Sequence, residues 1–149
     1  MKNIQYIILA FFICSCTATN NRITQPKTKP ICVMMNGDTI INTFCIITNV
    51  SVIPSAAHNY YWYYSGHINH AIGNYTGQLL HGSYEELNIN NSALLQKGQF
   101  EYGIKVGCWQ EWHSNGTIKS LTNYKDGIIE RLVQFDINGD TLRIIKQSN

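Results

Sequence analysis

Charge is scarce in this chain: of its 149 residues, 11 are Lys or Arg and 9 are Asp or Glu, so that only 13% are charged. That share is about half of what a typical soluble domain carries. The formal net charge of +2 excludes a polybasic nucleic-acid binder and an acidic disordered tail. Proline is scarce as well, with three residues, which excludes a proline-rich or collagen-like chain. The hydrophobic share of 44% suffices for one folded domain.

The signatures of common enzymes and cofactor sites are also missing. There is no Cys-x-x-Cys, no Gly-x-Ser-x-Gly and no Gly-x-Gly phosphate loop, so redox, hydrolase and nucleotide chemistry are unsupported. His58, His67, His70 and His81 lie close along the chain, but no Cys or carboxylate stands at a matching distance before Glu85. We therefore expect surface histidines, no metal, no cofactor and no catalytic residue.

Carboxylates for glycoside chemistry have no visible arrangement either. Glu85, Glu86, Glu101 and Glu111 are available, but nothing in the sequence sets two of them across a cleft, as that reaction requires. Charges on the face of a strand are the commoner explanation.

The N-terminus has the pattern of a secretory signal. Lys2 precedes an apolar run over residues 4–13, which is shorter than the roughly 20 residues of a membrane-spanning helix. The run ends in Ile13-Cys14-Ser15-Cys16, which resembles a bacterial lipobox with Cys16 as the acylated residue. We expect residues 1–15 to be a lipoprotein signal peptide; the alternative is an ordinary signal peptide with an incidental cysteine. Because no Asp or Glu follows Cys16 closely, the expected location is the outer membrane, facing the periplasm.

Residues 16–30 are expected to form a solvated tether. They are polar, rich in Thr and contain two prolines, a composition that favours an extended linker. Such a tether would hold the folded part off the membrane.

A β-hairpin with a connecting loop is predicted over residues 31–58, because Asn36-Gly37-Asp38 is a strong hairpin-turn signal. Cys32 and Cys45 lie on its two arms, in a compartment that permits disulfides. They are a candidate disulfide; the alternative is two small buried hydrophobic residues. Cys108 would stay unpaired.

The body of the chain, residues 59–145, has an internal repeat of about 24 residues. Gly98-Gln99-Phe100 follows Gly73-Asn74-Tyr75 after 25 residues, and Gly107-Cys108-Trp109 follows Gly82-Ser83-Tyr84 after 25. Turn signals recur in the same frame at residues 65–66, 90–91, 115–116 and 138–139.

Each repeat predicts two strands. An aromatic strand runs to a turn at Gly103, and a second strand carries Trp109 and Trp112 to a turn at Asn115-Gly116, for which type I′ geometry is expected. The spacing of three between the two Trp residues departs from strand alternation, so we expect a bulge or bend there.

These residues resemble the bacterial form of the membrane occupation and recognition nexus (MORN) repeat, found in chains labelled YwqK-like antitoxins. The matching residues are Gly98, Phe100, Gly103, Gly107, Trp109, Trp112, Asn115 and Gly116, followed by Tyr124 and Gly127 in the next copy. The resemblance implies all-β tandem hairpins in an elongated, twisted sheet, preceded here by the N-terminal hairpin. It also implies interaction or scaffold roles, with outer copies that depart from the pattern as capping repeats do.

Five consecutive aromatics, Tyr60, Tyr61, Trp62, Tyr63 and Tyr64, stand at the start of this body. Alternate members of a strand face opposite sides, so one set is expected in the core. The other set is either packed as well or forms an exposed patch that binds peptide, glycan or protein.

The leading hypothesis is a non-enzymatic lipoprotein, anchored in the lipid membrane through Cys16, whose repeats bind an unknown protein partner in the cell envelope. The alternative is an immunity or antitoxin-type protein that neutralises a toxin; the signal segment argues against a cytosolic antitoxin. A carbohydrate-binding protein or hydrolase is the third hypothesis.

Overall fold

The computed structural model describes residues 25–48 and 50–147; the predicted signal peptide and the acylation site Cys16 lie outside them. The described chain forms ten antiparallel strands, which confirms the all-β prediction. No helix among these residues is long and apolar enough to span a bilayer. The strands are β1 (Thr28–Met35), β2 (Thr39–Ile46), β3 (Asn59–Tyr64), β4 (His67–Ile72), β5 (Gln78–Asn88), β6 (Leu94–Glu101), β7 (Ile104–Trp112), β8 (Ile118–Lys125), β9 (Ile128–Phe135) and β10 (Thr141–Lys146).

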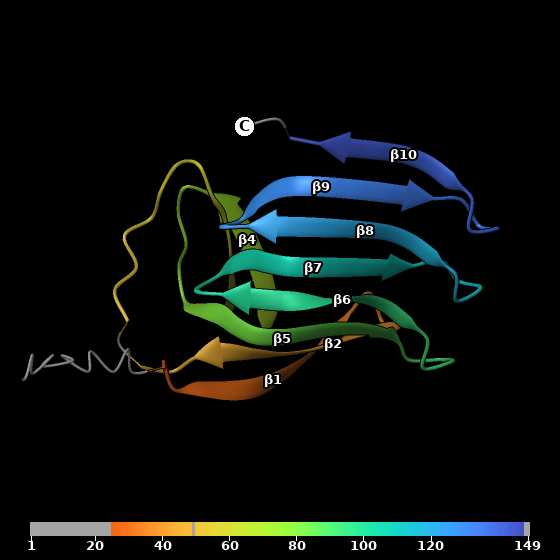
Figure 1. Ribbon diagram of the computed structural model, residues 1–149. Helices are drawn as coiled ribbons and strands as arrows, with labels where there is room; N and C mark the ends of the chain where they lie inside the picture. Colours follow the sequence, from red (N-terminus) through yellow and green to blue (C-terminus); the bar gives the residue numbers. More distant parts are fainter. Residues whose placement is uncertain (1–24, 49, 148–149) are drawn as a thin grey trace, which may run out of the picture.

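Eight strands form one open sheet in the order β1-β2-β5-β6-β7-β8-β9-β10. The hairpin β3–β4 leaves this order and lies across one face of the sheet, behind β5–β7 in Figure 1. Among the described residues, its strand pairing with the sheet is limited to β5, where Trp62 pairs with Leu79 and Tyr63 with Gln78. We call the face under this hairpin the inner face and the opposite one the outer face.

The N-terminal hairpin is part of this sheet. β2 pairs with β5 along its length. Residues 73–75 are the repeat equivalents of Gly98–Phe100 on β6, so the repeat predicted a strand there, next to β5. That prediction was wrong: β2 occupies the place beside β5, and residues 73–75 lie in the loop between β4 and β5. There Tyr75 packs against Tyr60 at 5.7 Å between ring centroids, and its hydroxyl donates to the carbonyl oxygen of Val52 at 3.0 Å.

Two buried clusters hold the layers together. The larger one, on the inner face, includes Tyr84, Phe100 and Trp109, and half-buried Tyr61 and Tyr63 from β3 pack against it. The smaller one lies on the other side of β3 and consists of Ile46, Tyr60, Trp62 and Leu79. Both sides of β3 are therefore buried. The inner face of the sheet packs on one side, and the loops from β2 to β3 and from β4 to β5 pack on the other.

The candidate disulfide between Cys32 and Cys45 is not formed, and these two residues and Cys108 are free thiols. Cys32 pairs with Asn42 across β1 and β2, while Cys45 pairs with Lys29. Residues 42 and 45 of one strand face opposite sides, so Cys45 is buried on the inner face and Cys32 is exposed on the outer face. The two sulfur atoms are separated by the register of β1 and β2, which the spacing of the cysteines along the sequence does not determine.

The turn from β6 to β7 is a two-residue turn, with φ of 46° at Tyr102 and 82° at Gly103. This turn packs against β3 and β5. The amide of Gly103 donates a hydrogen bond to the carbonyl oxygen of Leu80, and the carbonyl oxygen of Gly103 accepts one from the amide of Tyr61, both at 2.7 Å. A Cβ at Gly103 would stand 2.5 Å from a Leu79 methyl carbon. Gly103 is required both by the turn and by the close approach of the hairpin.

The turn at Asn115-Gly116 differs from the expected type I′ geometry. Only Gly116 has a positive φ, of 84°, whereas a type I′ turn needs positive values at both central residues. The chain instead closes a wider loop, in which His113 donates to Thr117 and Gly116 donates to His113, both at 2.9 Å. The bulge predicted between Trp109 and Trp112 is confirmed at Glu111–Trp112, against β8.

Gly116→Val should destabilise the protein through the backbone alone. A Cβ at this exposed position meets nothing within 4 Å, but a β-branched residue at this φ costs on the order of 1–3 kcal/mol. Chemical denaturation measures the loss. Ser114→Val, at an exposed position of the same loop with an ordinary φ, is the control; equal losses from both variants would show that φ is not the cause.

Candidate binding surfaces

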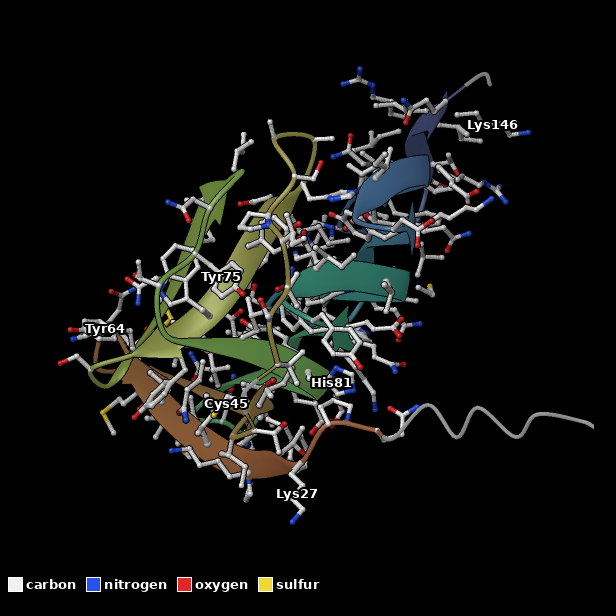
Figure 2. All side chains as sticks on the ribbon, turned by 90° about the vertical axis from the view of Figure 1, so that its left-hand side faces the viewer. Lys27, Cys45, Tyr64, Tyr75, His81 and Lys146 are labelled. Carbon is white, nitrogen blue, oxygen red and sulfur yellow. The ribbon has the colours of Figure 1, made fainter. Side chains whose placement is uncertain are left out.

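The five aromatic residues on β3 do not form an exposed binding patch. Tyr60 and Trp62 are 4% and 9% exposed and belong to the smaller core cluster. Tyr61 and Tyr63 point the other way, into the inner face of the sheet. Tyr64 alone, 61% exposed at the turn to β4, is open to solvent (Figure 2). The run therefore serves packing between the two layers.

The aromatics of the repeat form a continuous row on the inner face. Tyr84, Phe100, Trp109 and Tyr124 come from β5, β6, β7 and β8 in turn. Their neighbouring ring centroids are 5.5, 5.0 and 6.3 Å apart, within the range of favourable aromatic pairs. This is the packing role that the repeat pattern predicts for Phe100 and Trp109.

A lysine lies within this aromatic row. The ammonium nitrogen of Lys105 is 3.9 Å from the centroid of the Trp109 ring and about as far from Tyr61 as from Tyr124, at 5.5 and 5.6 Å. Burial lowers the pKa of Lys105 below 10.5, and the carboxylates of Glu111 and Glu86 partly offset that effect. Cation–π contacts with three rings thus replace part of the lost hydration.

Carboxylates and amides line the neighbouring inner-face positions. The side-chain amide of Gln96 donates to Glu111 at 3.1 Å, and the hydroxyl of Tyr84 donates to Glu86 at 3.1 Å. Burial, followed by the charge of Glu86, raises the pKa of Tyr84 far above its usual value. The cavity beside these groups measures about 140 Å³, room for a few waters at about 30 Å³ each. It is lined by Met35, Ile41, Tyr61, Ile68, His70, Tyr84, Gln96, Phe100, Lys105 and Trp109.

The buried lysine predicts a specific pH dependence. Because the pKa of Lys105 is lower in the folded protein, the unfolded chain binds its proton more tightly. The free energy of unfolding should therefore rise with pH up to the unfolded value of 10.5. Tyr61, Tyr84 and Tyr124 act in the opposite direction above pH 10, since burial raises their pKa values.

The comparison of wild type with Lys105→Met isolates the lysine, because both proteins keep the three tyrosines. Denaturation at a series of pH values should show the wild type gaining stability relative to Lys105→Met as the pH approaches 10.5. If the difference in the free energy of unfolding between the two proteins stayed constant with pH, Lys105 would not be a buried, charged group with a lowered pKa.

The outer face of β7–β10 carries a second, open hollow of about 330 Å³. Cross-strand pairing aligns Leu121 of β8 with Val133 of β9, and Val133 with Ile144 of β10. Val133 is 8% exposed, whereas Ile144 at the sheet edge is 54% exposed. We call this site the outer hollow; it is lined by Cys108, Leu121, Asn123, Arg131, Val133, Phe135, Thr141 and Ile144.

The rim of the outer hollow is positively charged. Arg131 of β9 and Lys146 of β10 are directly paired, and both are exposed. Like charges facing each other across strands destabilise a sheet. Within the described residues the ion pairs join Lys97 to Glu85 and Lys119 to Glu111; neither reaches this rim. An anionic group from outside would relieve the repulsion.

The remaining candidate residues are separated. His67 and His70 are exposed, as expected, but His81 is half-buried and its Nδ1 accepts the amide hydrogen of Tyr102 at 3.3 Å. Burial lowers the pKa of His81, and Glu101 opposes this shift. Among residues 25–48 and 50–147, no three His, Cys, Asp or Glu side chains gather as a metal site would need.

No protein-family model matches the chain, and neither the curated proteins nor the solved structures contain a significant match. The resemblance to MORN repeats therefore stays a prediction from the sequence. The sequence does not reveal the outer hollow, because its apolar residues come from three strands and only the register of the sheet brings them together.

Proposed function

We propose that this protein is a non-enzymatic lipoprotein, anchored in the membrane through Cys16, and that its hairpin sheet binds a partner protein in the cell envelope. The observation that supports this most strongly is the outer hollow. In this hollow the last strand leaves Ile144 54% exposed beside Leu121 and Val133, although a terminal repeat normally presents a polar surface to water. Exposed apolar groups that cluster in this way are typical of protein-binding surfaces.

The partner's chemistry follows from the hollow and its rim. The apolar floor of Leu121, Val133 and Ile144 fits an aliphatic or aromatic side chain. The paired cations Arg131 and Lys146 fit a carboxylate beside that side chain. The partner should therefore present a hydrophobic residue flanked by Asp or Glu, and the charges should set its orientation and speed its association.

Site-specific photocrosslinking in intact cells tests this function. A photoreactive residue at position 144 should yield a defined protein adduct, and Arg131→Glu/Lys146→Glu should abolish it. The matched control is position 34 on β1, at the far edge of the same face, where Met34 is 64% exposed and lies outside the outer hollow; no such adduct should form there. Adducts that form equally at both positions, or that survive the charge reversal, would refute the proposal.

Cys16→Ala should release the protein from the membrane fraction. Three acyl chains on one cysteine anchor stably, because each buried CH₂ contributes about 0.8 kcal/mol. Cell fractionation with a radiolabelled fatty acid measures both location and acylation. Cys14→Ala is the control and should change neither; membrane association of the Cys16→Ala protein together with retained label would contradict the anchor.

A further inference from the structure

Exposed aliphatic side chains gather at the end of the sheet where the described chain begins. The antiparallel order places the start of β1, the end of β2 and the loop to β3 at this one end, on the left of Figure 1 and facing the viewer in Figure 2. Ile53 is 88% exposed, Ile72 73% and Ile47 49%; Val50 is exposed as well. We call these four residues the anchor-end patch.

Backbone contacts place the patch beside the entry of the chain. The amide of Ile47 donates to the carbonyl of Lys27 at 2.9 Å. The amide of Gly73, directly after Ile72, donates to the carbonyl of His58 at 2.9 Å, which ties the end of β4 to the same loop. Ile47 thus borders the point at which the tether reaches the fold, and the loop that carries Val50 and Ile53 connects it to the end of β4 at Ile72.

Charge differs between the two ends of the sheet. The turns at the opposite end, at residues 36–38, 89–93, 113–117 and 136–140, contain Asp38, Asp136 and Asp140 but neither Lys nor Arg. The anchor end carries both signs of charge. Its cations are Lys27, Lys29, Lys125 and Lys146, and its carboxylates are Glu101, Asp126 and Glu130. An anionic surface would therefore repel the far end and accept the anchor end.

The tether keeps this end close to the bilayer. Lys27 follows Cys16 by eleven residues, which span at most about 40 Å when extended. Linkers this short give effective concentrations in the millimolar range, so even a weak contact between the patch and the membrane would be occupied.

We propose that the anchor end lies on the surface of an anionic phospholipid bilayer, with the four aliphatic side chains in the headgroup boundary and Lys27 toward the lipid phosphates. This inference rests on the lipid anchor of the proposed function. It replaces the expectation that the tether holds the fold off the membrane. The acidic turns then point away from the membrane, and the outer hollow stands sideways to it, open to a partner.

Depth-dependent quenching tests the orientation. The acylated protein is reconstituted in phosphatidylethanolamine–phosphatidylglycerol vesicles that contain brominated acyl chains. The added indole of Ile53→Trp should be quenched, whereas that of the control Ile137→Trp, exposed in the opposite turn, should not. Equal quenching, or none in either variant, would overturn the docking.

A second measurement separates docking from anchoring. The full Cys16→Ala chain, which has no acyl group, should bind the same vesicles only weakly, at high lipid concentration and low salt, and too weakly to remain in a cell membrane fraction; adding Ile53→Asp should weaken that binding about tenfold or more. Binding should also fall as salt is raised. No vesicle binding, or an equal effect from Ile137→Asp, contradicts the docking surface, while loss of acyl label in the wild type would contradict the anchor alone.

Discussion

Trp109→Ala should cost about 3–5 kcal/mol of stability, the range found for large aromatics in cores. Trp109 is 2% exposed and stands between Phe100 and Tyr124 in the aromatic row. Its indole nitrogen donates to the carbonyl of Gln99 at 3.2 Å, and its ring faces Lys105. The substitution removes all of these contacts at once and leaves a cavity. Since a domain of this size has about 5–15 kcal/mol in total, a large fall in the denaturation midpoint is expected.

Trp112→Ala is the control for Trp109→Ala. Trp112 is three residues further along the same strand but only half-buried, beyond the bulge. Its loss should be clearly smaller. If Trp109→Ala unfolded at the same denaturant concentration as the wild type, the side chain would not be a core residue, and the inner face would be assigned wrongly.

Gly98→Ala should destabilise the protein through a steric clash with the same indole. A Cβ at Gly98 would lie 2.2 Å from a ring carbon of Trp109, and the ring is held on both sides, so the indole must move. Overpacking of this kind typically costs about 1–3 kcal/mol. The backbone of Gly98 has an ordinary φ, so the cost comes from the contact alone.

A double-mutant cycle tests this explanation of Gly98. In the Trp109→Ala background the ring is gone, and Gly98→Ala should then be nearly neutral, so that the two losses do not add. Gln99→Ala, an exposed neighbour, is the control and should change stability by less than about 0.5 kcal/mol. Additive losses would mean that the glycine is needed for another reason.

The sequence predicted the features that depend on neighbouring residues. The turn at Gly103 and the bulge after Trp109 follow from local patterns of glycine and aromatic spacing. The all-β architecture also followed, because hairpin signals recur at a short period. The residues that stabilise these turns and strands are neighbours in the sequence, so local sequence patterns are enough to predict them.

Features that depend on register and long-range contact were not predictable. The separation of Cys32 from Cys45 is set by which residues pair across β1 and β2. The burial of Tyr60 and Trp62 depends on the hairpin β3–β4 leaving the sheet order and on loops that close over it. The outer hollow likewise combines β8, β9 and β10. No local pattern distinguishes these outcomes from their alternatives.

The most direct test of the account is the affinity of the partner that crosslinks at position 144. Its Kd should be measured for the wild type and for Arg131→Glu/Lys146→Glu over a range of salt concentrations. We predict that the charge reversal weakens binding at least about tenfold at low salt and that the difference shrinks as salt screens the rim. An unchanged Kd would contradict the assignment of the outer hollow as the binding surface.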